Sequence, residues 1–274
     1  MFNARLGCSS ISFRHQGLSL ALQTMAEIGF TEIDLGALPG VCDHVPFDLD
    51  TKAVAEVSAI IKRSKLRVRS VNGDIGDLNR PLDESQHAER DSHLNMLLTL
   101  AAATGARALV LPCGALETEP IQGLDKDLDM VASELVRAAR AAEDLGIEIW
   151  TESLHFFRLC CNMQRAEQLT SRLAPSDVRV VMDFSHIVAS GGNPVDFVDR
   201  FHHRIAHVHL RDAIPGNINL SIGNGRVNFA AGLLKLREMG YSGHFSLELE
   251  TRDISNEERP DAAAKAAGFI SSII

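Results

Sequence analysis

Hydrophobic and polar positions alternate along this chain in two patterns that succeed each other from one end to the other. Short runs rich in apolar and β-branched residues, typical of buried strands, are followed by longer stretches with the spacing of amphipathic helices. The strand-like runs cover residues 5–11, 32–36, 66–71, 107–111, 147–151, 178–183, 205–210 and 244–249. The helix-like stretches cover residues 17–29, 50–64, 84–104, 124–145, 162–173, 194–202, 228–239 and 257–272. The pattern therefore predicts eight pairs of one strand and one helix.

Glycines mark the ends of several predicted helices. Gly29, Gly105, Gly146 and Gly240 each follow an apolar-periodic stretch, at the position where a left-handed residue ends a helix. Strict alternation with short connections predicts an α/β protein with a parallel sheet. Eight units favour closure into a (β/α)8 TIM barrel, and an open doubly wound sheet stays an alternative. We expect residues 1–274 to form a single domain.

The composition argues against several classes of protein. Hydrophobic residues make up 45% and charged residues 23% of the chain, which is enough apolar material for a sizeable core and disfavours disorder. The 36 acidic and 27 basic residues give a net charge of −9, opposite to the usual footprint of a nucleic-acid binder. Neither a signal-peptide pattern nor an apolar run of membrane-spanning length stands out, and the five cysteines are scattered. We expect a cytoplasmic protein with reduced thiols and with neither a nucleic-acid nor a membrane partner.

Four side chains of the metal-ligand type stand at the ends of four successive strand-like runs. They are Glu152 in GIEIWTE, Asp183 in VRVVMD, His209 in IAHVHL and Glu248 in FSLELE. In a (β/α)8 barrel the carboxyl ends of the strands meet at one rim, so these residues are expected to surround one divalent ion. Three carboxylates and one imidazole form an oxygen-rich set, which favours Mn²⁺. Mg²⁺, Co²⁺ and Zn²⁺ are the alternatives.

The strand period leaves two choices of ligand open. His207 and His209 share one face of the seventh run, and Glu248 and Glu250 share one face of the eighth. Depth along the strand favours His209 over His207, whereas Glu248 and Glu250 are harder to separate. The G-x-G at 223–225 fits either a phosphate cradle or, as we favour, a tight turn before the next helix.

Five segments carry a resemblance to a known family: GFTEIDL, TESLH, MDFSH, HVHLRD and the run from SIGNGRV to SLELE. They resemble the xylose isomerase-like TIM barrels, specifically the sugar phosphate isomerase/epimerase group, which includes ketose 3-epimerases and inosose isomerases and dehydratases. The resemblance spans nearly the whole chain. It implies that Glu152, Asp183, His209 and Glu248 are metal ligands.

The same resemblance implies roles in catalysis and substrate binding. Glu152 and Glu248 would flank the reacting carbon, one removing a proton and the other returning it on the opposite face. His186 would bind substrate, Arg211 would steady a substrate oxygen, and His155 would face the substrate. The endonuclease IV branch of the family is disfavoured because SVNGD, LPCG and GRVNF lack histidines that its three-metal cluster uses.

The leading hypothesis is a metal-dependent isomerase or epimerase that acts on a sugar or cyclitol by enediolate proton transfer. A dehydratase of the inosose or dehydroshikimate type, using the same metal and base, is the alternative within enzymes. A polyol-binding or partner subunit without turnover of its own is the alternative outside them. Association into a homo-oligomer and phosphorylation of the substrate stay open.

Overall fold

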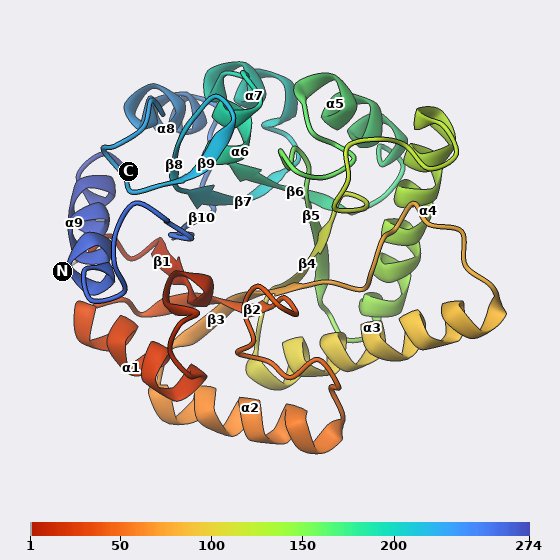
Figure 1. Ribbon diagram of the computed structural model, residues 1–274, viewed down its shortest axis with the longest axis horizontal. Helices are drawn as coiled ribbons and strands as arrows, with labels where there is room; N and C mark the ends of the chain where they lie inside the picture. Colours follow the sequence, from red (N-terminus) through yellow and green to blue (C-terminus); the bar gives the residue numbers. More distant parts are fainter. Residues whose placement is uncertain (1) are drawn as a thin grey trace.

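A closed barrel of parallel strands forms the centre of the molecule, which a computed structural model describes over residues 2–274. Within this range eight strands close in the order β1-β10-β7-β6-β5-β4-β3-β2, and helices surround them (Figure 1). The barrel strands are β1 (Leu6–Ser9), β2 (Glu32–Ala37), β3 (Arg67–Gly73), β4 (Ala108–Pro112), β5 (Glu148–Glu152), β6 (Arg179–Asp183), β7 (Ile205–Leu210) and β10 (His244–Leu247). The predicted (β/α)8 barrel is confirmed, and the open sheet is excluded.

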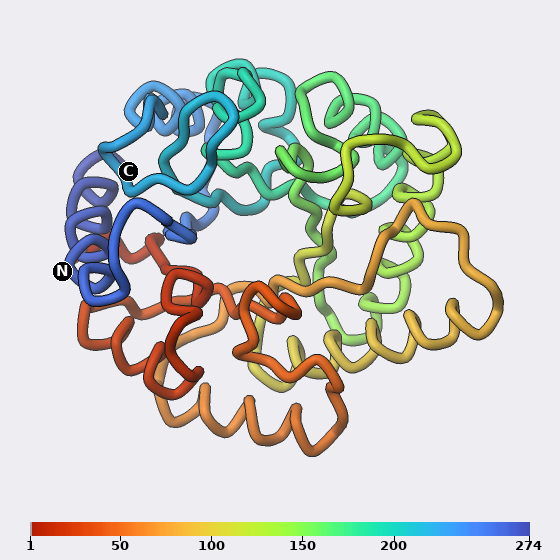
Figure 2. Tube along the Cα trace, in the orientation of Figure 1, coloured from red at the N-terminus to blue at the C-terminus, as the bar shows by residue number. Residues whose placement is uncertain are grey.

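The helices form the outer layer. They are α1 (Leu18–Ile28), α2 (Thr51–Ser64), α3 (Glu84–Thr104), α4 (Leu124–Glu143), α5 (Met163–Arg172), α6 (Phe184–Ala189), α7 (Pro194–Phe201), α8 (Phe229–Glu238) and α9 (Arg259–Ser271). The first and last parts of the chain lie side by side (Figure 2), where the backbone N–H of Asn3 donates to Ser271 Oγ at 3.0 Å. The last helix therefore completes the ring beside the first strand.

Helix ends follow the local signals in the sequence. Gly29, Gly105, Gly146 and Gly240 have φ angles of 109°, 71°, 65° and 79°, which confirms the predicted left-handed ends. Helix α3 begins with a capping box in which Asp83 and the third helical residue bond reciprocally. Because these glycines end the helices shortly before the next strand begins, the connections are short and the chain returns to the amino end of that strand.

Four short elements were not predicted. A 3-10 helix, η1 (Ser10–Phe13), replaces the end of the first predicted strand, and α6 starts directly after β6. An antiparallel pair, β8 (Asp212–Ile214) and β9 (Asn217–Leu220), follows β7. All four follow the carboxyl ends of barrel strands, the side on which the candidate ligands lie.

The apolar core of the described residues has one large part and two small clusters, one of which consists of Ala189, Ala213 and Ile218. The larger part packs between strands and helices, and a small cluster of Ala108, Val110, Trp150 and Val181 comes from β4, β5 and β6. Trp150 is 1% exposed and its ring lies 5.5 Å from that of His207, which places it in the barrel interior. Among the described residues, none of the helices has the length and hydropathy needed to cross a membrane.

Candidate metal and substrate site

The four predicted ligands all lie at the carboxyl rim of the barrel. Glu152 and Asp183 are the last residues of β5 and β6, His209 is the penultimate residue of β7, and Glu248 directly follows β10. Asp183 and His209 are paired in register on neighbouring strands. The strand ends thus bring residues that are far apart in sequence to one rim, as the fold predicts.

Three of these side chains form a compact group. One ligand atom from each of Glu152, His209 and Glu248 lies within 4.8 Å of the other two, and His209 Nδ1 is 3.5 Å from Glu248 Oε2. Asp183 lies beside this group. Its Oδ2 is 3.7 Å from an Nη atom of Arg211, which is also 3.9 Å from Glu248 Oε2.

Several donor atoms in this group have no partner within the protein. Glu152 Oε1, Asp183 Oδ2 and His209 Nδ1 are buried and make no hydrogen bond to the part of the chain that the structure describes. Buried polar atoms are normally satisfied, so orphans gathered at one place indicate a missing partner. Three carboxylates and an imidazole fit a divalent cation as that partner.

The electrostatics of the site also favour a cation. Burial, and then the carboxylates of Asp183 and Glu248, raise the pKa of Glu152 well above its ordinary value. Burial opposes a charge on His209, but Glu248 and Asp34 outweigh it and raise the pKa of this imidazole well above its usual range. The folded protein therefore holds protons here that a divalent ion would displace.

The local sequence MDFSH orients Asp183. Its Oδ1 accepts hydrogen bonds from the Ser185 backbone N–H and hydroxyl, both at 2.6 Å, and from the His186 backbone N–H at 3.2 Å. Asp183 therefore caps α6 with one carboxylate oxygen. The other oxygen, Oδ2, remains available for a ligand.

The predicted substrate residues line a cavity of about 340 Å³ above the ligand group, together with Glu152 and Glu248. The backbone N–H of Phe156 donates to His186 Nδ1 at 3.0 Å, and His186 Nε2 lies 3.3 Å from an Nη atom of Arg211 and 3.2 Å from Glu152 Oε1. Burial, then Arg211, lowers the pKa of His186 well below its usual range, so the ring is neutral. This neutral ring lines the cavity beside Arg211 and Glu152.

Arg211 and His155 complete this wall. Arg211 is 1% exposed, its Nε donates to Ser185 Oγ at 3.1 Å, and an Nη atom lies 3.4 Å from Glu250 Oε2. Burial opposes its charge, but Asp183 and the neighbouring glutamates raise the pKa of Arg211, so it stays cationic. The ring of His155 lies 3.9 Å from that of His186, between centroids.

The second glutamate of the LELE segment lies elsewhere. Glu250 pairs with Arg14 at 2.7 Å and with Arg211 at 3.4 Å, at the edge of the cavity. Glu248 contacts His209 instead. The geometry therefore groups Glu248, rather than Glu250, with the other candidate ligands, and their role as ligands stays a proposal.

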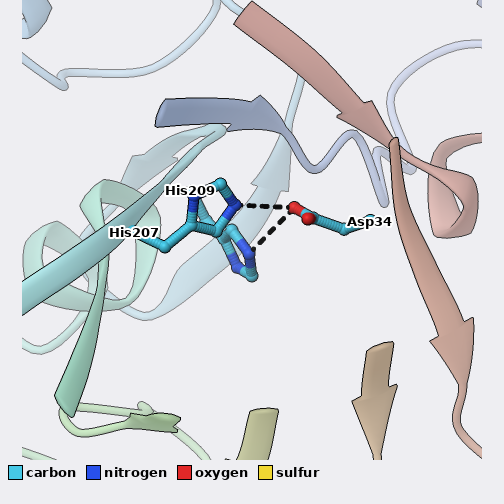
Figure 3. Close-up of side chains that lie close together, drawn as sticks. All are labelled: Asp34, His207 and His209. Carbon is cyan, nitrogen blue, oxygen red and sulfur yellow. Dashed lines mark hydrogen bonds and ion pairs between the residues drawn. The ribbon is translucent and has the colours of Figure 1, made fainter. Parts of the chain in front are cut away.

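Sequence reasoning missed residues inside the barrel. Asp34 of β2 is fully buried, with Oδ2 2.8 Å from His207 Nε2 and 3.4 Å from His209 Nε2 (Figure 3). Burial opposes its charge, but His207 and then His209 hold the pKa of Asp34 well below its usual range. Asn72 Nδ2 donates to Glu248 Oε1 at 3.4 Å. The sequence signal that could have indicated Asp34 is its place as a single acidic residue within the otherwise apolar run IDL.

The G-x-G segment forms a turn around an internal carboxylate. The backbone N–H groups of Gly223 and Gly225 donate to Asp212 Oδ2 at 2.8 and 3.0 Å, and that of Val227 donates to Asp212 Oδ1 at 3.1 Å. These amides are the groups that a phosphate would use. The favoured interpretation as a tight turn is therefore confirmed.

Comparison with known proteins gives the family. Residues 22–273 match the family described as xylose isomerase-like TIM barrel. The chain belongs to this family. The resemblance seen in the sequence motifs is thereby confirmed.

Curated relatives are distant. An uncharacterized protein of Methanocaldococcus jannaschii is 26% identical over 259 residues, which cover 90% of this chain and 84% of that protein. The inosose dehydratase of Clostridium botulinum is 27% identical over 127 residues, 44% of this chain and 41% of the enzyme. That of Geobacillus kaustophilus is 26% identical over 158 residues, about half of each chain. The matches to these two enzymes thus span 41% and 51% of their length.

Solved structures share the fold at low identity. The D-allulose 3-epimerase of Methylomonas sp. has a TM-score of 0.80 and 19% identity, covering 100% of this chain and 99% of the other. The IolI protein, whose structure contains a bound zinc atom, has a TM-score of 0.78 and 19% identity. The match covers 98% of this chain and 99% of the IolI chain. At such identities the likeness establishes the fold alone.

Proposed function

We propose that this protein is a metal-dependent isomerase or epimerase acting on a sugar, a cyclitol or a similar polyhydroxy-carbonyl compound. The observation that chiefly supports the proposal is the compact group of Glu152, His209 and Glu248 at a polar cavity. Carboxylates can transfer a proton at the carbon next to a substrate carbonyl, and a cation bound beside that carbonyl would favour this step. Sugar epimerases among the similar structures are compatible with this reading.

Glu152, Asp183, His209 and Glu248 would hold the divalent ion. The orphaned atoms of Glu152, Asp183 and His209 and the raised pKa values of Glu152 and His209 favour such a ligand. The donor set favours Mn²⁺, with Mg²⁺, Co²⁺ and Zn²⁺ as alternatives. When bound, the ion would polarise the substrate carbonyl and acidify the neighbouring C–H group. The zinc atom of the IolI structure indicates that a divalent ion is compatible with this fold.

The two glutamates would transfer the proton. They reach the site from β5 and from the end of β10, which β6 and β7 separate around the barrel. A substrate carbon between Glu152 and Glu248 would have one carboxylate on each face, so one removes the proton and the other returns it with inversion. Burial and nearby acids make Glu152 a stronger base, which offsets part of the basicity that a carboxylate loses beside a cation.

Hydrogen-bond donors would stabilise the enediolate that forms when the proton leaves. The imidazole of His186 and the guanidinium of Arg211 both line the cavity. Fixed donors stabilise a growing oxygen charge because they need no reorientation during the reaction. His155 would complete the wall on the same side.

A dehydratase is the second candidate, and the inosose dehydratases among the relatives favour it. In that reaction the same base removes the proton, but the electron pair then expels the hydroxyl of the next carbon, which takes a proton from a carboxyl group of the site and leaves as water. The metal ligands and base would be unchanged.

The test is a panel of ketoses and inososes incubated with the Mn²⁺-loaded protein in D₂O, followed by mass spectrometry. Epimerisation or isomerisation with solvent exchange places one deuterium in the product, whereas dehydration removes one water. No conversion of any panel member by protein with bound metal would contradict both enzymatic candidates.

A further inference from the structure

Asp34 is a carboxylate removed from water inside the barrel. Its Oδ1 accepts a hydrogen bond from Ser70 Oγ at 2.8 Å, and its Oδ2 faces two histidines of β7. None of the ion pairs in residues 2–274 joins it to a lysine or an arginine. Burying a carboxylate is costly without strong partners, so its contacts with His207 and His209 are the main compensation for its charge.

These contacts cross the barrel interior. Strands β2 and β7 are not neighbours, because β1 and β10 lie between them in the closed sheet. Figure 3 shows Asp34 reaching from one side toward the rings of His207 and His209 on the other. His207 Nε2 makes the shorter contact, at 2.8 Å, and the rings of the two histidines meet edge to face at 5.2 Å.

The two nitrogens of His209 face different partners. Nε2 is 3.4 Å from Asp34 Oδ2, whereas Nδ1 is 3.5 Å from Glu248 Oε2. A neutral imidazole carries one N–H, and carboxylates that accept this N–H commonly fix the ring of a metal-binding histidine. A proton on Nε2, directed at Asp34, leaves the Nδ1 lone pair directed at the Glu248 side.

We infer that Asp34 is a positioning residue that sets the tautomer and ring orientation of His209 for metal binding through Nδ1. The inference rests on the proposed metal role of His209. A simpler view is that Asp34 serves only to pair with His207 and stabilise the barrel. The two views predict different behaviour of metal affinity and of folding stability.

The experiment compares Asp34→Asn with His207→Gln in the full-length protein, using Co²⁺ as probe. Asp34→Asn keeps the size of the side chain but removes the charge, so we expect Co²⁺ affinity to fall by roughly 10- to 100-fold, with an altered visible spectrum. His207→Gln breaks the shorter contact of Asp34 and leaves the carboxylate facing His209. We expect it to lose stability but to keep Co²⁺ affinity and spectrum close to those of the wild type.

Two outcomes would overturn the inference. If Asp34→Asn keeps wild-type Co²⁺ affinity and spectrum while both variants lose similar stability, Asp34 only pairs with His207. If the wild type itself binds no Co²⁺, the proposed metal role fails and the inference fails with it.

A measurement on the wild type covers the case in which Asp34→Asn does not fold. Long-range proton–nitrogen NMR of the ¹⁵N-histidine-labelled, Zn²⁺-loaded protein reports which nitrogen of each ring carries the proton. We expect His209 to be protonated at Nε2 with the metal on Nδ1. Metal on Nε2 would overturn the inference directly.

Discussion

Single side chains at the barrel rim carry charges that depend on one another. Burial, Asp183 and Glu248 raise the pKa of Glu152, while Glu248 and Asp34 raise that of His209 against the effect of burial. Carboxyl groups held this close together keep their protons unless a bound cation replaces those protons. The protonation state of each of these side chains therefore depends on the others in the group.

Replacing either proposed base with its amide tests their role in proton transfer. Glu152→Gln and Glu248→Gln keep the side-chain size but remove the basic oxygen, so we expect turnover to fall by about 10²- to 10⁴-fold. Circular dichroism should show an intact fold. Glu148→Gln, at the other end of β5 and paired with Arg107, is the matched control and should remain active. Near-normal turnover in both rim variants would count against the mechanism.

The sequence was sufficient to place the predicted ligands at one rim, because a position at a strand end follows from the local pattern. It could not single out Asp34. Its partner His207 lies 173 residues away, and only closure of the barrel brings β2 opposite β7. Strand period also left His207 and His209 equivalent, because both side chains point inward.

The segment after β7 folds around one buried carboxylate. Asp212 is 2% exposed and accepts backbone hydrogen bonds from Gly223, Gly225 and Val227. A Cβ added at Gly225 would lie 2.1 Å from Asp212 Oδ1 and 2.6 Å from Ala213 O. The turn therefore depends on a close approach that only glycine allows here.

Gly225→Ala should lower the free energy of unfolding by about 1–3 kcal/mol, because the added methyl group forces this turn apart. Gly268→Ala in α9 is the control, since a Cβ there meets nothing within 4 Å. It should raise stability by about 0.5–1 kcal/mol through better helix propensity. Urea titration measures both, and equal effects at the two positions would refute the packing argument.

Element lengths explain which parts of the fold could be predicted. Long helices such as α3 and α4 show their period and their caps, and glycines such as Gly105 mark their ends. Helix α6 has six residues, less than two turns, so no period can be read from it. Its start depends on Asp183, which sequence reasoning had assigned only to the metal.

At the scale of the whole molecule, metal binding and pH should act together on stability. Because the pKa values of Glu152 and His209 are raised, both groups hold protons at higher pH than free side chains do. A metal ion must displace those protons, so its affinity should rise with pH, by about tenfold per pH unit for each proton released.

Thermal unfolding with a fixed excess of Mn²⁺ measures this coupling. The gain in Tm should be larger at about pH 8 than at about pH 6, because tighter binding to the folded state adds stability. Glu152→Gln removes one of the two titrating groups and should weaken the pH dependence. A gain in Tm that is independent of pH would contradict the displacement of protons, and no gain at either pH would favour a protein without the metal.

The closed barrel follows from regular alternation along the chain, whereas the chemistry at its rim depends on four side chains reaching one ion. Diffraction from crystals grown with Mn²⁺, recorded on both sides of the manganese absorption edge, locates that ion. We predict an anomalous peak at roughly 2.0–2.3 Å from atoms of Glu152, Asp183, His209 and Glu248. Manganese bound elsewhere in the crystal, with these four side chains left without it, would contradict the proposed site.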